Sequence, residues 1–229
     1  MGSMVDFKSN GDTARGYLAG DRGPGVLVVQ EWWGLNPHMK SVADDLAGEG
    51  FVALAPDLYR GELAGHDEMD KAAQLMTALP MDRAARDMSG AVDFLAAQPG
   101  LSGDALGAVG FCMGGGLVLA LGTMRPDKLK AIVPYYGVLG FDDDGAPDWS
   151  KLDAAVLGHY GESDHFFPAD KARALEDGLQ SLGKQAQLIV YSGRGHAFAS
   201  SHDAMGTYHA DDAAQAWQRT VSFLHEHLG

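Results

Sequence analysis

Residues Leu106–Gly116 read LGAVGFCMGGG, and this stretch decides the fold. Its first half is apolar throughout, as in a strand that helices cover on both faces. Its second half contains the pattern G-x-C-x-G, with Cys112 at the centre. A sharp strand-to-helix turn strains its central residue, and small residues two places before and after keep the neighbouring backbone clear. The stretch therefore predicts a strand, a turn that lifts Cys112 to the sheet edge, and a helix whose free N–H groups lie near the sulfur.

Further short apolar runs along the chain have the character of parallel strands buried on both faces. They are Gly25–Gln30, Phe51–Ala55, Ala131–Tyr135, Ala155–Tyr160 and Gln187–Tyr191. Two runs near the start, Val5–Phe7 and Gly16–Ala19, are expected to add an antiparallel edge.

Helical segments separate these runs. One begins at Asn36-Pro37, an N-cap followed by proline, and continues with an apolar face at 3.6-residue spacing. The others are Arg83–Ala97, Ala169–Leu182 and Asp211–Leu228. Alternating strands and helices predict one doubly wound, mostly parallel α/β sheet over residues 4–229, in the manner of an α/β-hydrolase. We interpret Met1–Ser3, which precede a second methionine, as a cloning remnant outside this domain.

The composition excludes several classes of function. The net charge of −14, without a cluster of Lys or Arg, argues against binding to nucleic acid. No apolar run reaches the roughly 18 residues that a membrane helix needs, and no secretory leader opens the sequence. The single cysteine rules out an internal disulfide and fits a reducing compartment, so we expect a cytoplasmic monomer or homodimer.

Two loops offer partners for Cys112. Asp164 follows the strand that ends at Tyr160, and His196 follows the next strand, so both are expected at the same sheet edge as the cysteine. The chain order of nucleophile, acid and base is that of an α/β-hydrolase. Each has an alternative interpretation. Cys112 could be a buried structural thiol, Asp164 could cap the following helix, and Glu162 is a rival acid.

The remaining histidines have plainer interpretations. His159 and His165 flank Asp164, but no ligand spacing typical of a metal site appears, so we expect no metal and no other cofactor. The histidines near the C-terminus are expected to be solvated; they are His202, His209, His225 and His227.

Taken together, six motifs resemble those of the dienelactone hydrolase family, in order and with comparable spacing from Gln30 to the C-terminus. They are Gln30–Gly34 (QEWWG), Pro56–Arg60 (PDLYR), Gly110–Gly115 (GFCMGG), Tyr135–Gly137 (YYG), Gly161–Asp164 (GESD) and Gly195–Phe198 (GHAF). The resemblance implies an α/β-hydrolase that opens an ester or lactone through a triad of Cys112, His196 and Asp164. It also implies that Glu31 contacts the resting thiol and moves away when substrate arrives. The backbone N–H groups of Met113 and Trp32 would form the oxyanion hole.

This chemistry is two-step acyl transfer. The thiol attacks the carbonyl and forms a thioester, which water activated by His196 then hydrolyses. A carboxylate beside a thiol disfavours the thiolate, so Glu31 would protect the resting cysteine from oxidation. A surface carboxylate in a polar loop is the alternative interpretation of Glu31.

The chain departs from the family where members that use dienelactone bind the substrate carboxylate. Ser200 stands where the resemblance leads us to expect arginine, and the helix near Met69–Met76 lacks its basic residue. Arg60 or Lys71 could substitute, although lysine offers no bidentate fork. We expect instead a neutral ester or lactone in an apolar pocket formed by Trp33, Tyr136, Met76 and Phe198. Trp33 and Tyr136 could equally be core residues.

Other functions are compatible with some of these motifs. A carboxylesterase with the same triad, or a binding protein on the same fold, would share these motifs, because fold alone does not fix function. A redox thiol protein is disfavoured, because no second cysteine is present to resolve a sulfenic acid.

Arg60–Pro80 fits the strand-and-helix pattern least well, and we expect it to form part of the pocket wall.

Overall fold

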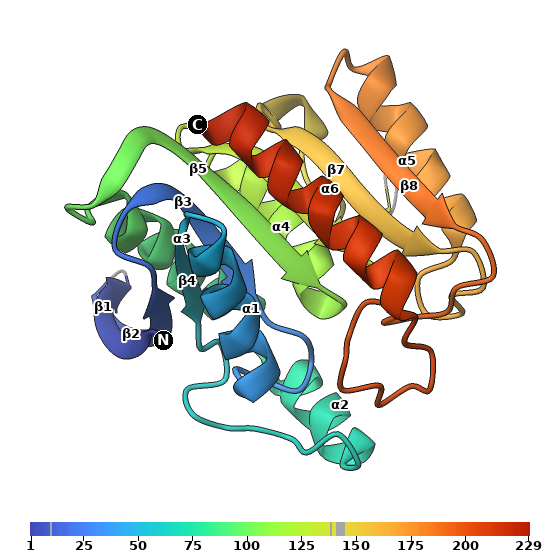
Figure 1. The fold of residues 1–229 in the computed structure, drawn as a ribbon, viewed down its shortest axis with the longest axis horizontal. Coiled ribbons are helices and arrows are strands. Elements are labelled where there is room, and N and C mark those ends of the chain that lie inside the picture. Colours follow the sequence, from blue (N-terminus) through green and yellow to red (C-terminus); the bar gives the residue numbers. More distant parts are fainter. Residues whose placement is uncertain (10, 138, 141–144) are drawn as a thin grey trace.

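The computed structural model describes residues 1–9, 11–137, 139–140 and 145–229 (Figure 1). Its centre is an eight-stranded sheet with the strand order β1-β2-β4-β3-β5-β6-β7-β8. The strands are β1 (Ser3–Ser9), β2 (Asp12–Ala19), β3 (Gly23–Val29), β4 (Val52–Pro56), β5 (Leu101–Phe111), β6 (Leu129–Tyr135), β7 (Ala155–Gly161) and β8 (Ala186–Tyr191). The strands from β3 to β8 pair in parallel, whereas β1 and β2 form the antiparallel edge. The predicted α/β-hydrolase fold class is confirmed.

Helices cover both faces of the sheet (Figure 1). Two of them, α1 (Pro37–Gly48) and α6 (Ala210–Leu228), pack on one face, and the opposite face carries α3 (Met81–Ala96), α4 (Met113–Met124) and α5 (Ala169–Ser181). This sandwich explains why the central strands are mostly apolar on both faces. Val26, Leu27 and Val29 of β3, for example, are all fully buried.

The start of α1 is the cap predicted from the sequence. Asn36 Oδ1 accepts the backbone N–H of Met39 at 3.0 Å, and Pro37 occupies the first turn. In contrast, α2 (Met69–Ala78) has no side-chain cap and buries only Ala72 among its helical residues. It stands away from the sheet, beside the carboxyl ends of the strands (Figure 1).

Two expectations about element bounds are corrected. β1 begins at Ser3, which pairs with Leu18, and therefore extends before the predicted Val5–Phe7; the origin of Met1–Ser3 stays a prediction. β5 begins at Leu101 and not at Leu106, because Leu101 pairs with Gly23 beyond an irregularity in the β3–β5 ladder. The polar residues Ser102–Asp104 of this extension gave no apolar pattern to detect. Among the described residues, no helix is both long enough and apolar enough to cross a membrane.

Candidate active site

Cys112 lies at the turn between β5 and α4, in a backbone conformation that few residues adopt. Its φ and ψ are 54° and −120°, and a residue held in such a region stores about 1–3 kcal/mol of strain. Close packing around the turn maintains it. A Cβ atom on Gly114 would lie 2.4 Å from the carbonyl oxygen of Val29, and one on Gly137 would lie 1.9 Å from that of Cys112 itself. Gly114 and Gly137 are therefore required by close contact with the backbone of Val29 and of Cys112.

Asp164 and His196 meet on the loops after β7 and β8. His196 Nδ1 lies 2.8 Å from Asp164 Oδ2, and both side chains are buried. The other oxygen of Asp164 accepts the backbone N–H groups of Phe166 and Phe167 at 2.8 and 2.9 Å. The carboxylate thus orients the imidazole while the loop before α5 fixes the carboxylate.

The rival acid, Glu162, faces away from this pair. Its carboxylate is exposed and accepts hydrogen bonds from the Ser192 hydroxyl at 2.7 Å and from the Gly193 N–H at 2.9 Å. It has no contact with His196 among the hydrogen bonds of the described residues. The geometry therefore favours Asp164 as the partner of the imidazole.

Cys112 and His196 line one cavity of about 500 Å³. Trp32 and Met113, whose amides the resemblance assigns to the oxyanion hole, line it too. Most of the remaining wall is apolar, and its larger members include Met76, Met81, Leu117, Leu139, Phe166 and Met205. Among the described lining residues, His196 is the only side chain that can carry a positive charge.

The thiol of Cys112 is held in its neutral form. Burial raises its pKa from 9.0 to about 12, and the negative charge of Glu31 acts in the same direction. The backbone N–H groups of Met113 and Trp32 act the opposite way, by hydrogen bonding to the sulfur. These two amides therefore lie beside the sulfur of Cys112.

Glu31 follows β3 and is 1 % exposed. Its Oε1 accepts the hydroxyl of Ser200 at 2.7 Å, and its Oε2 lies 2.9 Å from Nε2 of His202. Burial alone would raise the pKa of the carboxyl, but its interactions with His202 and Ser200 lower it below its ordinary value. The surface-carboxylate interpretation of Glu31 is therefore wrong.

His202 corrects another expectation. Its side chain is only 8 % exposed, because the loop after β8 turns it inward against Glu31. The other histidines of the C-terminal region behave differently: His209 accepts the Asp212 N–H and caps α6, and His225 contacts the Glu49 carbonyl. Sequence patterns gave no signal for His202, since this loop has no periodicity.

His159 is a core residue. Its two ring nitrogens contact the hydroxyls of Tyr191 at 3.0 Å and Thr220 at 3.1 Å, and burial lowers its pKa to about 3. Among the described residues, one group has the composition of a metal site, namely Glu31, His38 and His202. It does not include Asp164, His159 or His165.

The predicted substrate pocket agrees with the cavity in part. Met76 lines it. Trp33, Tyr136 and Phe198 do not line it, and all three are fully buried in the core. The Tyr136 hydroxyl instead bonds Ser200 at 2.8 Å.

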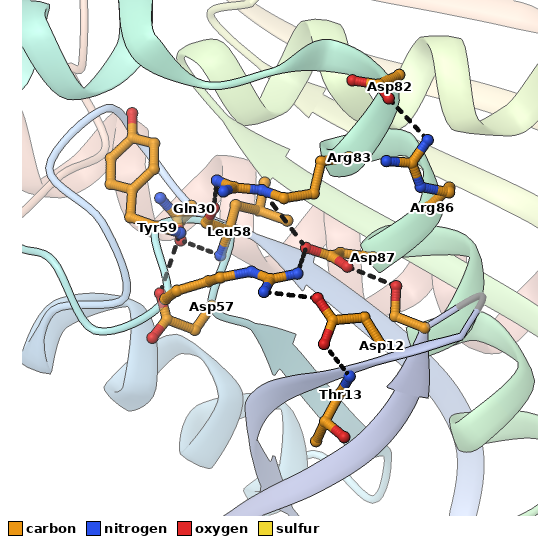
Figure 2. Close-up of polar contacts among 12 residues, drawn as sticks. Asp12, Thr13, Gln30, Asp57, Leu58, Tyr59, Asp82, Arg83, Arg86 and Asp87 are labelled. Carbon is orange, nitrogen blue, oxygen red and sulfur yellow. Dashed lines mark hydrogen bonds and ion pairs between the residues drawn. The ribbon is translucent and has the colours of Figure 1, made fainter.

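Neither proposed substitute for the missing cation lines the cavity. Arg60 has a positive φ of 55° and turns toward the β1–β2 edge, where it pairs with Asp12 at 2.7 Å and lies 3.8 Å from Asp87. Figure 2 shows Asp12 and Asp87 in this network, close to Arg83. Lys71 of α2 is also absent from the described lining. The cavity therefore has no guanidinium or ammonium group in its described wall.

Comparison with known proteins identifies the family of the chain. The sequence profile of the dienelactone hydrolase family matches residues 14–228. The chain belongs to this family. It is 34 % identical over 236 residues to a protein of Aquifex aeolicus named "Putative carboxymethylenebutenolidase", with all of both chains covered. The family membership and the enzyme class predicted from the motifs are confirmed, and the chain is a hydrolase that acts on lactone or ester bonds.

Solved structures resemble this dienelactone hydrolase family member over nearly its whole length. A crystal structure named "Putative Dienelactone Hydrolase", from Klebsiella pneumoniae, has a TM-score of 0.84 at 28 % identity, covering 99 % of each chain. A dienelactone hydrolase-like promiscuous phosphotriesterase from metagenomic libraries has a TM-score of 0.82 at 28 % identity, covering 100 % of this chain and 99 % of that one.

Proposed function

We propose that this hydrolase cleaves neutral esters or lactones with Cys112 as nucleophile, His196 as general base and Asp164 as the residue that orients it. The observation that carries the proposal is that Cys112 and His196 line one cavity while His196 Nδ1 is occupied by Asp164. In neutral imidazole the nitrogen that donates to a carboxylate carries the proton, so Nε2 is left as the base.

The reaction would proceed in two balanced steps. The Sγ atom of Cys112 bonds to the carbonyl carbon while its proton passes to His196 Nε2; the acyl C–O bond then breaks, and the leaving oxygen takes that proton. Water next gives a proton to His196 and its oxygen to the thioester carbon. The thiolate leaves and regains the proton from the imidazole.

The amides of Met113 and Trp32 would stabilise the oxyanion of both tetrahedral intermediates. Met113 is the first residue of α4, where N–H groups have no partner within the helix. Removing one such donor from a hydrolase costs on the order of 10²–10³-fold in kcat. Since they are backbone groups, their position depends on the strained turn at Cys112 and on the loop after β3.

The substrate class follows from the cavity wall. An anionic lactone would lose its hydration there without meeting a cation from the described wall, and burying an unpaired charge is strongly unfavourable. A neutral acyl group gains from contact with Met76, Leu117 and Phe166. The proposal therefore excludes dienelactone, a carboxylate, as the preferred substrate. The single cysteine also fits a reducing compartment, which supports a cytoplasmic location.

The test is turnover of a panel of esters and lactones, half of them carrying a carboxylate, by wild type and Cys112→Ala. We expect neutral substrates to react faster and the variant to fall to background. Mass spectrometry of acid-quenched wild type should find one acyl group on Cys112, the only cysteine. Undiminished turnover by Cys112→Ala would overturn the nucleophile, and a strong preference for carboxylate substrates would overturn the substrate class.

A further inference from the structure

The neighbours of Glu31 form a directed chain of hydrogen bonds. Ser200 donates to Glu31 Oε1, so the hydroxyl of Tyr136, 2.8 Å from Ser200 Oγ, is left to donate to Ser200. On the other side, the Ala204 N–H donates to His202 Nδ1 at 3.2 Å. Because Nδ1 is an acceptor, the proton of neutral His202 is on Nε2, and it points to Glu31 Oε2 at 2.9 Å. Both chains of hydrogen bonds end on Glu31, which only accepts and must therefore be ionised.

Three aromatic rings from separate segments hold His202 in this orientation. The ring of His66, in the loop before α2, stacks on it with 3.9 Å between centroids. His38 of α1 meets it edge-on at 5.0 Å, and Trp33 meets it edge-on at 6.5 Å. His66 itself is fixed by Asn36 Nδ2, 3.1 Å from its Nε2.

The charges around this cluster favour neutral rings. Burial lowers the pKa of both His38 and His66, and a charge on His202 would lower them further. Glu31 opposes this effect at both rings, and Asp67 opposes it at His66. A neutral imidazole is sufficient for the bond to Glu31, since Nε2–H is already the donor.

We propose that His202 is a positioning residue for Cys112: its Nε2–H bond keeps Glu31 ionised and in place, and Glu31 in turn keeps the resting thiol protonated. The significance of this arrangement for catalysis rests on the proposed role of Cys112 as nucleophile, whereas its effect on the resting thiol does not. Without the Nε2–H donor, Ser200 would be the only remaining hydrogen-bond donor to the buried carboxyl of Glu31. A buried carboxyl group that loses a hydrogen bond to its ionised form becomes harder to ionise. The thiol would then lose the negative charge that opposes its own ionisation.

A metal ion on Glu31, His38 and His202 is the competing interpretation, since their ligand atoms lie within 4.8 Å of one another. The hydrogen bonds oppose it. A metal on Nε2 of His202 would require that nitrogen to give up its proton while Nδ1 still accepts from Ala204. Metal-bound histidine normally donates its second N–H to an acceptor. The geometry thus suits a proton donor.

The experiment measures the rate of alkylation of Cys112 by iodoacetamide from pH 6 to pH 9, without substrate. Cys112 is the only cysteine, so the signal has one source. The variants are His202→Leu, His202→Gln, Glu31→Gln and the double variant Glu31→Gln/His202→Leu. Gln offers an amide donor in place of Nε2–H, and is the conservative control.

Glu31→Gln should raise the alkylation rate about three- to tenfold, by a similar factor at every pH. Each unit by which the thiol pKa falls gives tenfold more thiolate. Because a thiolate of lower pKa is a weaker nucleophile, part of this gain in rate is lost. His202→Leu should match it near pH 6 and approach wild type by pH 9, as its Glu31 ionises. His202→Gln should resemble wild type. In the Glu31→Gln background, His202→Leu should add nothing.

Some outcomes would overturn the proposal. One is a ratio of His202→Leu to wild type that does not change with pH; another is an effect of His202→Leu that persists without Glu31. Tightly bound metal in purified wild type, lost in His202→Leu, would favour the metal site instead. Thermal unfolding of each variant identifies a folding defect. If His202→Leu has such a defect, the proposal is tested by His202→Gln, whose alkylation profile should match that of wild type. Ester turnover by Cys112→Ala tests the proposed function separately, because the alkylation profile does not depend on it.

Discussion

The two sides of Cys112 differ in how they accommodate polar groups. On one side is a cavity of about 500 Å³ with a mostly apolar wall, where His196 is the only described side chain that can become a cation. On the other side lies Glu31, which is 1 % exposed and whose two carboxylate oxygens each have a partner. The buried side-chain atoms of the described chain that have no hydrogen-bond partner belong to Gln30, Arg83 and Asp87, and none belongs to the Glu31 network.

This difference explains the state of the thiol. On the cavity side, a thiolate is disfavoured because apolar groups replace its hydration. On the Glu31 side, it is disfavoured by a fixed negative charge that the network stabilises. A substrate carbonyl changes the first side directly, and it changes the second only if Glu31 moves away, as the resemblance implies. The comparison therefore predicts that changes on the cavity side alter turnover and substrate choice, and changes on the Glu31 side alter the resting thiol.

The largest expected effect concerns the base on the cavity side. Asp164→Asn preserves an oxygen for the N–H groups of Phe166 and Phe167 but presents an amide to His196 Nδ1. The imidazole would then carry its proton on Nε2, which is the wrong tautomer for a base. We expect kcat for a neutral ester to fall on the order of 10⁴-fold, as for the equivalent loss in serine proteases.

Glu162→Gln is the matched control for Asp164→Asn. Glu162 is the neighbouring acid, and it bonds only to Ser192 and Gly193 among the described contacts. We expect its kcat to equal that of wild type. An equal loss in both variants would mean that the loop, and not the pair with His196, is what turnover requires.

The resting thiol should be unreactive toward alkylating agents. With its pKa at about 12 in place of 9.0, the thiolate fraction at pH 8 is lower by about 10³-fold. The thiolate of a thiol with a higher pKa is a stronger nucleophile, which recovers part of the lost alkylation rate. The folded protein should thus react with iodoacetamide roughly 30-fold more slowly than the same chain unfolded in urea. Equal rates in the two states would show that neither side of Cys112 restrains it.

A cation placed in the cavity should change substrate choice without changing the thiol. Met76 of α2 lines the cavity and is 40 % exposed, so a longer side chain can be accommodated there. In Met76→Arg, the ratio of kcat/KM for a carboxylate lactone to that for a neutral ester should rise about tenfold, which corresponds to about 1.4 kcal/mol, within the range of a charged hydrogen bond. Met76→Leu controls for the loss of the methionine. An unchanged ratio would remove the argument from the missing cation.

The two sides of Cys112 also differ in what the sequence could predict. The elbow, Asp164 and His196 each follow an apolar strand, so periodicity and chain order located them at one sheet edge. His202 has no such marker. Its burial depends on the ring of His66, which is far away in sequence, and on a loop whose path is set by tertiary packing. Arg60 was misjudged for a similar reason, since its positive φ of 55° turns it away from the cavity.

The pocket residues show the same limit. Trp33, Tyr136 and Phe198 have the composition of a binding wall, but Tyr136 and Phe198 belong to a large buried cluster and Trp33 to a smaller one. Met81, Phe166 and Met205 line the cavity instead, from α3 and from two loops. Which apolar side chain faces a cavity is decided by the packing of distant segments, and that information is not present in local pattern.

The smallest expected effect concerns stability, and it again separates the two sides. On the Glu31 side, Asn36 is 5 % exposed, caps α1 and contacts His66. Asn36→Ala should lower the free energy of unfolding by about 1 kcal/mol, the usual contribution of an N-cap, whereas Asn36→Ser keeps the cap and should lose only a few tenths.

On the cavity side, Met81 is 60 % exposed although it lines the wall, so Met81→Ala should stay within about 0.5 kcal/mol of wild type. Urea denaturation of the three variants measures all of these differences. If Met81→Ala proved as costly as Asn36→Ala, the cavity wall would be as firmly packed as the Glu31 side. A wall of that kind would not adapt to varied acyl groups, and the enzyme should then accept a narrow range of neutral esters.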